Sequence, residues 1–475
     1  MKPTHQRAYA LDALRGYAII TMVLSATVVA GILPEWMYHA QTPPPTHAYV
    51  PEISGLTWVD LVFPFFLFAM GAALPFSIGS RVERGERWWR VALDVVLRWL
   101  QLAFFAVFIQ HFYPYVLSAP QDLRSWGLAM AAFAVLFPMF MRFEKVPVWG
   151  RVAIKVTAYA VAVTMLLTTT YAYDRVFSPE FSNIIILILS NVALFAGVIY
   201  LATSAKWLHG NGRWVRVGLF VLLALLVLGA DKEGSWASRV MHYSPVWWLL
   251  RFDYLRYLLI LLPAMEVGEM LRESMKASEA TERGSRNDRW AVVLAVAAVT
   301  LVVATLGAVQ NHLIGLWAVV VVALLVVMGI SSRRVDGSMG TLWRRLTLVA
   351  AVLMALGVMV EPLQGGIKKD PATLGYLFST AGLAVATLVA LSVVVDYFGC
   401  RKALAFLWQS GQNPMVAYVA CDLVVYPILN TTGAVALLWP LYSSPWLGAL
   451  HGVILTTITV LITTLTTRKK WFWRT

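Results

Sequence analysis

Charged residues are scarce in this chain of 475 residues. Asp, Glu, Lys and Arg make up 13% of it and hydrophobic residues 59%, whereas a soluble domain usually carries about 25% charge. Apolar runs of about 20 residues recur from end to end, which is typical of polytopic helical membrane proteins. The alternation of apolar and polar residues that membrane β-barrels require is lacking in runs such as VGLFVLLALLVLGA. The sequence therefore predicts an all-α, polytopic membrane bundle.

Cysteine is nearly absent as well. Only Cys400 and Cys421 occur, both in or near apolar segments, so a disulfide framework is excluded. No Gly/Ser-rich linker or low-complexity tract separates the apolar runs. The first residues, MKPTHQRAYALDALRG, are polar and the first apolar run has full helix length, so no cleavable signal peptide is expected. These features predict a single membrane domain over residues 1–475.

The apolar runs predict about 12–14 transmembrane helices in a lipid bilayer. Fourteen candidate spans can be drawn, and the loss of one closely spaced hairpin would leave twelve. They cover residues 11–33, 55–80, 88–113, 123–142, 150–172, 182–204, 212–230, 250–272, 290–309, 312–330, 341–361, 371–398, 404–430 and 446–467.

Basic residues sort the connections between these spans into two sets. The net charge is +13, but Lys and Arg lie between apolar runs, which indicates membrane topology rather than nucleic-acid binding. The N-terminus, every second connection and the C-terminus hold 28 of the 38 Lys and Arg residues, and the other connections hold 8. Loop 34–54 has none. The positive-inside rule then predicts that both termini lie in the cytoplasm and that loop 34–54 lies outside. We expect the membrane to be a bacterial inner membrane.

Loop 34–54 carries His39 and His47 and runs into an apolar segment whose mouth holds Asp60. Asp60 has no basic residue at helical spacing. It could cap its helix or bond the backbone that Pro64 frees. Alternatively, its carboxylate could orient a histidine and raise the basicity of the imidazole. A loop histidine followed by a helix-mouth acid on the same side of the membrane favours the second interpretation.

Three further polar groups fall in or beside predicted spans, where ionisable residues are costly. Asp12 and Arg15 share a helix face at the cytoplasmic mouth of the first span, so Arg15 could pair with Asp12 or contact a phosphate. In WQSGQNPMVAYVACD, Gly411 and Pro414 are predicted to break a helix near the cytoplasm, and such breaks are tolerated where they line a cavity. The segment EPLQGGIKKDPATLGY is predicted at the outer face and suits either a ligand site or a solvated loop.

Several of these motifs resemble a known family. LDALRG, a long apolar run, W-x-x-H-A and GLTWVDLVFPFFLFAMG occur in this order. They resemble the membrane domain of heparan-α-glucosaminide N-acetyltransferase and its NagX-like bacterial relatives in the transmembrane acyltransferase group. GQNPMVAYVACD resembles the late G-x-N-x-x-x-x-Y segment of that family. The resemblance covers residues 8–75 and, more weakly, 361–425. Where relatives have an Asn after the M-V of the first span, this chain has Ser25, Ala26 and Thr27.

The resemblance implies an acetyl-CoA-dependent transmembrane N-acetyltransferase. In that family, a histidine before the GLT string handles the transfer of an acetyl group from cytosolic acetyl-CoA to a glucosamine amine across the membrane. His39 fits the W-x-x-H-A context, with Asp60 as its support, and His47 is the alternative. The expected acceptor is an amino sugar or glycan at the outer face. Residues expected to contact acetyl-CoA are Asp12, Arg15, Asn413, Arg401 and Lys402, and those expected to contact the acceptor are Lys368, Lys369, Asp370, Thr373 and Asp422.

Two mechanisms and one rival function remain open at this point. Neutral His39 could take a proton from the acceptor or carry the acetyl group itself. CoA is strongly anionic, so its nucleotide end should stay at the basic cytoplasmic face while the pantetheine arm enters the bundle. A transporter for a sugar or related solute is the alternative, because many spans, broken helices and a midplane Asp422 suit it too. We expect neither a metal cofactor nor a nucleic-acid partner, and the oligomeric state, including a homodimer, stays open.

Overall fold

The computed structural model describes residues 7–28, 31, 33–141, 143, 146–204, 208, 210–280 and 287–473, apart from the side chains of 278–280. Within these residues the chain is helical and contains no β-strand. Thirteen helices in the described part are long and apolar enough to cross a membrane. The protein is therefore a multi-pass membrane protein, and the predicted all-α bundle of about 12–14 spans is confirmed.

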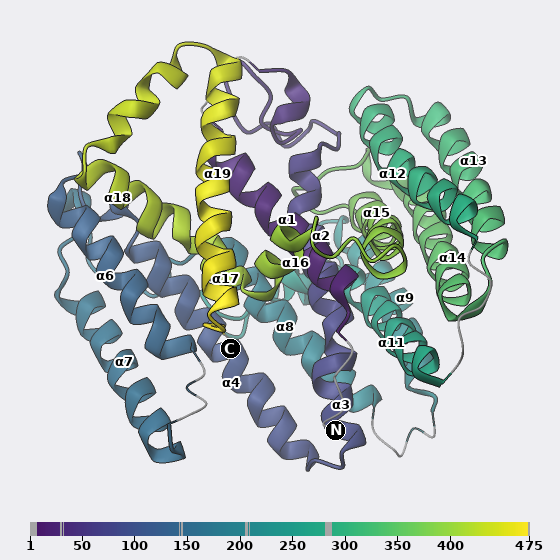
Figure 1. The fold of residues 1–475 in the computed structure, drawn as a ribbon, viewed down its shortest axis with the longest axis horizontal. Coiled ribbons are helices and arrows are strands. Elements are labelled where there is room, and N and C mark those ends of the chain that lie inside the picture. The colour runs from purple at the N-terminus through teal and green to yellow at the C-terminus, as the bar shows by residue number, and fades with distance from the viewer. Residues whose placement is uncertain are drawn as a thin grey trace.

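The helices succeed one another with mostly short connections (Figure 1). The long helices are α1 (Tyr9–Thr27), α2 (Trp58–Leu74), α4 (Trp88–His111), α6 (Leu123–Phe140), α7 (Val148–Thr168), α8 (Ile184–Thr203), α9 (Gly212–Ala230), α11 (Leu258–Ala280), α12 (Asp288–Gln310), α13 (Ile314–Arg333), α14 (Gly337–Val360), α15 (Leu374–Leu391) and α19 (Pro445–Arg468). Shorter helical segments include η1 (Glu35–Met37), α10 (Trp236–Met241), η5 (Phe252–Tyr257), α16 (Ala405–Gln412), α17 (Pro414–Ala420), η8 (Cys421–Val425), α18 (Tyr426–Thr431) and η9 (Ala434–Tyr442).

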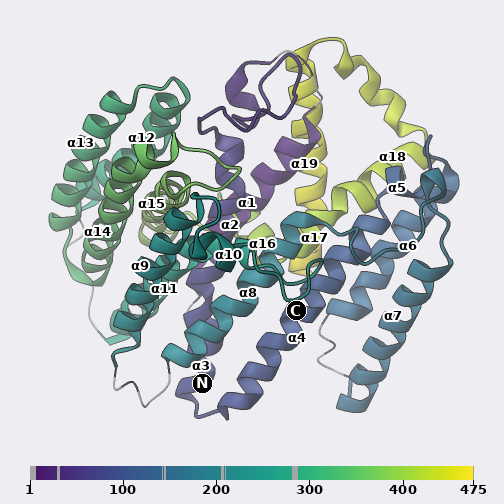
Figure 2. The ribbon, with the colours of Figure 1, turned by 180° about the vertical axis from the view of Figure 1, so that it is seen from behind.

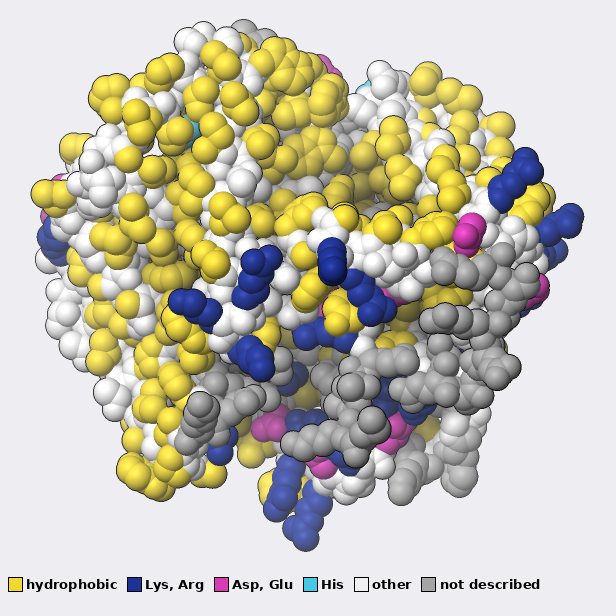
Figure 3. Space-filling model, in the orientation of Figure 1, with side chains coloured by type: hydrophobic (Ala, Val, Ile, Leu, Met, Phe, Trp, Pro, Cys, Tyr) yellow, Lys and Arg dark blue, Asp and Glu magenta, His cyan; other side chains and the backbone are white. Residues whose placement is uncertain are grey.

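Two lobes flank a central group of helices. Helices α6 and α7 lie on one side and α12, α13 and α14 on the other, with α1, α2 and α17 between them (Figures 1 and 2). Most Lys and Arg side chains visible in Figure 3 lie below a largely hydrophobic upper surface. Large apolar side chains such as Leu225, Val303 and Val319 are exposed on the outer helices, as expected where helices face lipid.

Helix α15 forms the centre of the bundle. Nearly every residue from Leu374 to Ala390 is buried, and α15 packs against α1, α2, α11, α12 and α14. A helix that is apolar on all sides is expected to be surrounded by other helices rather than by lipid on one face. The loop that precedes α15, residues 361–373, is thereby placed beside the start of α2.

The predicted span at 250–272 differs most from the structure. Residues 252–257 form the 3₁₀ helix η5, and α11 begins only at Leu258. From Glu266 onward α11 carries several charged residues, so it is not among the thirteen apolar helices. Its Glu266 forms an ion pair with the buried Arg216 at 2.7 Å. Charge is tolerated here because the carboxylate has a partner on α9.

The predicted helix break near Pro414 is present, but Gly411 has another role. Helix α16 ends at Gln412 and α17 begins at Pro414, whereas Gly411 lies within α16. A Cβ atom on Gly411 would lie 1.9 Å from the carbonyl oxygen of Asp12, and one on Gly16 would lie 1.8 Å from that of Leu407. The two glycines therefore allow the backbones of α1 and α16 to touch.

Candidate functional site

Asp60 lies in the first turn of α2, where it stabilises the helix N-terminus. Its Oδ2 atom accepts hydrogen bonds from the Thr57 N–H at 3.0 Å, from Thr57 Oγ1 at 3.0 Å and from the Ala40 N–H at 3.1 Å. An acid at this position that bonds back to the residue preceding the helix is a common N-terminal signal. Asp60 is 2% exposed, so three donors fix this carboxylate inside the protein.

The second carboxylate oxygen of Asp60 contacts His39. Oδ1 lies 2.7 Å from His39 Nδ1, and the His39 side chain is 38% exposed against 2% for Asp60. In a neutral imidazole held this way, Nδ1–H donates to the carboxylate and the lone pair remains on Nε2. Asp60 therefore combines both roles considered from the sequence, because one oxygen stabilises the helix and the other orients a histidine.

His47 lies apart from this pair. Its Nε2 atom is 3.3 Å from the carbonyl oxygen of Gly31, and its ring packs edge-on against Tyr38 with the centroids 4.4 Å apart. Among the two candidate histidines, the structure brings His39 rather than His47 to Asp60.

Lys369, from the distant segment 361–376, lies against His39. Its Nζ atom is 3.0 Å from Nδ1 and 3.1 Å from Nε2 of the imidazole. No carboxylate of the described residues lies within ion-pair distance of this ammonium. Burial lowers the pKa of Lys369, and the charges of Asp60 and Asp370 counteract this in part. Two polar groups that the sequence places more than three hundred residues apart thus form one site.

Backbone contacts hold the two loops together. The Gln41 side chain bonds the backbone of Asp370 twice: Oε1 accepts from its N–H at 2.9 Å, and Nε2 donates to its carbonyl oxygen at 2.5 Å. The Gly55 N–H donates to the Ile367 carbonyl oxygen at 2.9 Å. Gln41 is 4% exposed. Asp370 therefore contributes its backbone to the site through Gln41.

Thr373 and Lys368 shape the same loop. Thr373 Oγ1 accepts from the Tyr376 N–H at the start of α15 at 3.4 Å and from the Lys368 N–H at 3.1 Å. Thr373 is buried. Neither Thr373 nor Lys368 lines the cavity that His39 and Lys369 face, so of the two adjacent lysines only Lys369 reaches it.

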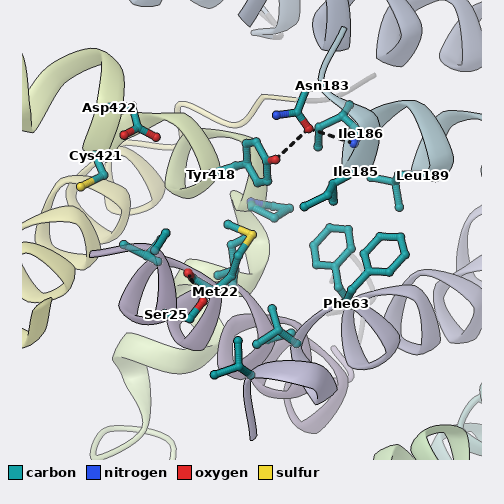
Figure 4. Close-up of a pocket in the computed structure, with 18 of the residues that line it drawn as sticks. Met22, Ser25, Phe63, Asn183, Ile185, Ile186, Leu189, Tyr418, Cys421 and Asp422 are labelled. Carbon is teal, nitrogen blue, oxygen red and sulfur yellow. Dashed lines mark hydrogen bonds between the residues drawn. The ribbon is translucent and has the colours of Figure 1, made fainter. Parts of the chain in front are cut away.

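A cavity of about 540 Å³ extends from His39 and Lys369 into the bundle. Its walls come from α1, α2, α4, α8, α17 and η8, and they are largely apolar (Figure 4). Along α1 the lining runs from Ala18 to Thr27, which at about 1.5 Å per residue is roughly 14 Å of depth. That is about half of a ~30 Å hydrocarbon core.

A second polar group lies in the same cavity. Asn183 Oδ1 accepts from Tyr418 Oη at 2.9 Å, and its amide lies 3.5 Å from Tyr113 Oη. Asp422 also lines the cavity and makes no hydrogen bond or ion pair with a described side chain. Burial raises the pKa of Tyr113, and the nearby Tyr418 and Asp422 raise it further. Figure 4 shows Asp422, Tyr418 and Asn183 around one space.

Residues predicted to contact acetyl-CoA lie elsewhere. Arg15 is 3.4 Å from Asp12 and donates to the carbonyl oxygens of Gly411 at 3.2 Å and Ala69 at 3.3 Å. Its guanidinium thus joins α1, α2 and α16. Neither Arg15 nor Asp12 lines the cavity. The close contact between Gly16 and Gly411 lies next to them along α1.

Asn413, Arg401 and Lys402 are also absent from the cavity wall. Asn413 is fully buried, and its side chain bonds Thr466 Oγ1 at 3.1 Å and the backbone of Trp471 and Trp473 near the C-terminus. Arg401 lies over the ring of Tyr9 at 4.6 Å, and Lys402 is exposed. The structure therefore does not bring the predicted acetyl-CoA residues together with His39.

The comparisons with known proteins identify a family. Residues 7–271, more than half of the chain, match a family described as a domain of unknown function, DUF5009. The chain belongs to the DUF5009 family. None of the curated proteins compared with it matches. In this DUF5009 protein, His39 and Asp60 lie within the matched region, whereas Lys369, α15 and Asp422 lie beyond it.

Several residues of this site were not anticipated from the sequence of the DUF5009 protein. Gln41 follows the W-x-x-H-A motif directly, but nothing in its surroundings indicates a partner on Asp370. Asn183 lies at the start of α8, where an Asn before an apolar run is an ordinary helix-capping signal. Tyr113 precedes a proline in the short connection that follows α4. Their shared cavity becomes evident only in three dimensions.

The arrangement offers three kinds of chemistry at one cavity. His39 Nε2 is a proton acceptor or nucleophile whose ring is oriented by a buried carboxylate. Lys369 is a cationic hydrogen-bond donor beside it. Asp422, on η8, is an acceptor that no described donor satisfies. No group of three His, Cys, Asp or Glu side chains suited to hold a metal occurs among the described residues.

Proposed function

We propose that this DUF5009 protein is a membrane-embedded acyltransferase. It moves an acetyl group from acetyl-CoA to an amino sugar or glycan at the outer face of a bacterial inner membrane. One observation carries the proposal: His39 is oriented by the buried Asp60 and faces a large cavity within the bundle. A carboxylate-bound imidazole at a cavity is the arrangement that acyl transfer uses to activate a nucleophile.

The transfer can follow either of two routes at His39. In direct transfer, Nε2 takes a proton from the acceptor amine or hydroxyl as that atom attacks the thioester carbon. In two-step transfer, Nε2 attacks the thioester first, and the resulting acetyl-imidazole then passes its acetyl group to the acceptor. Asp60 serves both routes, because it fixes the tautomer with the lone pair on Nε2.

The thioester has to reach His39 from the cytoplasm. The apolar walls of the cavity suit the uncharged pantetheine arm. Entry from the cytoplasmic side requires the contact between Gly16 and Gly411 to open, because the backbones of α1 and α16 touch there. Arg15, which joins α1, α2 and α16 at this level, is then the nearest cation for the phosphates of CoA, as Arg binds phosphate oxygens in bidentate fashion.

The proposed orientation has both termini in the cytoplasm and loop 34–54 outside. A single cysteine at Thr42, in a variant lacking Cys400 and Cys421, should react with a membrane-impermeant maleimide added to intact spheroplasts. Labelling that occurs only after the membrane is opened would reverse the orientation.

A transporter is the second candidate, and one observation favours it. Asp422, which makes no hydrogen bond with a described side chain, lines the cavity beside the broken helix of α16 and α17. An ionisable group beside a broken helix within the bundle is an arrangement that transporters use to bind solutes or coupling ions.

Acetyl transfer in detergent separates the two functions. The purified full-length protein is incubated with acetyl-CoA and glucosamine, and N-acetylglucosamine is measured by mass spectrometry. We expect turnover by the wild type, loss of about 10²–10⁴ in rate for His39→Ala, and nearly full activity for His47→Ala, whose ring does not contact Asp60. An active His39→Ala together with an inactive His47→Ala would move the role to His47. Absence of turnover with glucosamine and with outer-membrane glycan fragments, combined with solute uptake by proteoliposomes, would establish the transporter instead.

A further inference from the structure

The ammonium group of Lys369 lies beside His39 at the cavity, where the substrate of the proposed reaction would bind. Lys369 Nζ lies 3.0 Å from Nδ1 and 3.1 Å from Nε2 of His39, and both residues line the cavity. Nδ1 is already engaged with Asp60 Oδ1 at 2.7 Å. Because Nζ is nearly equidistant from the two ring nitrogens, the ammonium lies over the face of the imidazole, and the in-plane lone pair on Nε2 remains available.

The protein holds the backbone of Lys369 firmly but leaves its charge without a counter-ion. Gln41 bonds both backbone groups of the next residue, Asp370, and Gly55 bonds Ile367 two positions earlier. No carboxylate of the described residues comes within ion-pair distance of Nζ. The flexible four-carbon stem of a lysine lets the ammonium move by several ångströms while the loop stays in place.

We infer that Lys369 is a second catalytic group of the acyl transfer, which donates a hydrogen bond to the carbonyl oxygen of the thioester. This inference rests on the proposed function. In the structure the ammonium lies over the imidazole ring. When the acceptor atom meets the Nε2 lone pair in the ring plane, the ammonium turns to the adjacent carbonyl oxygen. A cation held where negative charge develops stabilises the tetrahedral intermediate more than the bound thioester.

The step balances without any further reactant. The acceptor nitrogen attacks the carbonyl carbon, a C–N bond forms, and the π electrons of the C=O bond move to the oxygen beside Lys369. His39 Nε2 takes the proton from the nitrogen. The oxyanion then collapses, the C–S bond breaks, and the departing thiolate receives the proton from His39. Lys369 keeps its own proton throughout and returns to the face of the imidazole when the products leave.

Steady-state kinetics test this role with acetyl-CoA and glucosamine as probes. Full-length Lys369→Met and Lys369→Arg are compared with the wild type and with Lys232→Met, an exposed lysine of the connection between α9 and α10 that does not line the cavity. Lys369→Met should lower kcat by about 10²–10³ and change the KM for acetyl-CoA by less than about threefold, because the donor acts in the transition state. The kcat of Lys369→Arg should be at least about tenfold higher than that of Lys369→Met, and the kcat of Lys232→Met should stay within about twofold of the wild type.

Chemical modification provides a readout that needs no turnover. Diethyl pyrocarbonate acylates the free lone pair of a neutral imidazole, and the modified His39 is quantified by peptide mass spectrometry. Lys369→Met should raise the rate of modification several-fold, because the ring loses the adjacent positive charge that lowers the nucleophilicity of Nε2, and Lys232→Met should leave it unchanged. An unchanged rate in Lys369→Met would show that the ammonium does not lie against the His39 ring and would overturn the inference.

The possible failures are distinguishable. If His39→Ala is inactive while Lys369→Met keeps kcat within about twofold of the wild type, Lys369 is not catalytic and the proposed function stands. If the wild type transfers no acetyl group, the proposed function fails and the catalytic role of Lys369 fails with it. If Lys369→Met elutes as an aggregate, Lys369→Arg decides the matter: kcat equal to that of the wild type supports a charged donor, and a loss as large as that of His39→Ala overturns it.

Discussion

The side-chain amide of Gln41 bonds the backbone of Asp370 at both its N–H and its carbonyl oxygen. This pair joins loop 34–54, which carries His39, to loop 361–373, which carries Lys369. Gln41 is 4% exposed, so water cannot replace the two bonds. The position of Lys369 against His39 therefore depends on a residue that touches neither of them.

Replacing Gln41 should separate the two loops. In Gln41→Ala, the N–H and carbonyl oxygen of Asp370 lose buried partners, which costs about 1–3 kcal/mol. We expect a lower melting temperature by differential scanning fluorimetry and a fall in acetyl transfer toward that of Lys369→Met. Gln121→Ala, at an exposed glutamine of the connection that precedes α6, should change neither quantity. Equal activity of Gln41→Ala and the wild type would show that Lys369 is positioned without the Gln41 bonds.

The sequence predicted the bundle well because hydropathy determines which segments enter a membrane. It predicted α11 poorly, since the charges of that helix are neutralised by residues such as Arg216 on another helix. The approach of His39 and Asp60 could be anticipated because the two residues lie 21 positions apart on one side of the membrane. The contact of Lys369 with His39 could not, because no local pattern encodes a pairing across 330 positions.

The geometry of Asp60 predicts which substitution separates its two roles. In Asp60→Asn, the amide oxygen can keep the bonds from Thr57 and Ala40, and the NH₂ group then faces His39 Nδ1. Nδ1 must become an acceptor, so the proton moves to Nε2 and the base is lost. A wrong tautomer of this kind costs up to about 10⁴ in kcat in a hydrolase triad, so we expect a loss of about 10²–10⁴ with little change in melting temperature.

Two further variants control for the tautomer argument. Asp60→Ala should lower the melting temperature as well as the activity, because the Thr57 and Ala40 donors lose their acceptor. The double variant His39→Ala/Asp60→Asn should be no slower than His39→Ala alone, since residues that act as a unit are not additive. A double variant slower by the product of both single effects would mean that Asp60 acts independently of His39.

The contact of α1 and α16 makes Gly411 intolerant of any side chain. A Cβ atom there would lie 1.9 Å from the carbonyl oxygen of Asp12, so Gly411→Ala must push the two helices apart at a cost of about 1–3 kcal/mol. Gly218→Ala is the matched control, because this glycine lies on α9 with no atom within 4 Å of the added Cβ. It should instead stabilise the protein by about 0.5–1 kcal/mol through helix propensity. Changes in melting temperature that have the same sign in both variants would contradict the close contact.

The charge of Lys369 is buried and only partly offset by Asp60 and Asp370, which predicts that Lys369→Met is more stable than the wild type. Burial lowers the pKa of Lys369 below its ordinary value of 10.5, so the unfolded chain holds this proton to a higher pH than the folded protein does. By proton linkage, stability rises with pH between the two pKa values. The destabilisation by Lys369 is therefore full below the lowered pKa and vanishes above 10.5. We expect Lys369→Met to gain on the order of 1 kcal/mol at the lower pH, with a difference in melting temperature that shrinks as the pH is raised toward 10.5. Lys232→Met, at an exposed lysine, should show no such difference. A Lys369→Met protein that melts below the wild type at every pH would mean that the ammonium stabilises the fold. The presence of Lys369 at this position would then need no catalytic explanation.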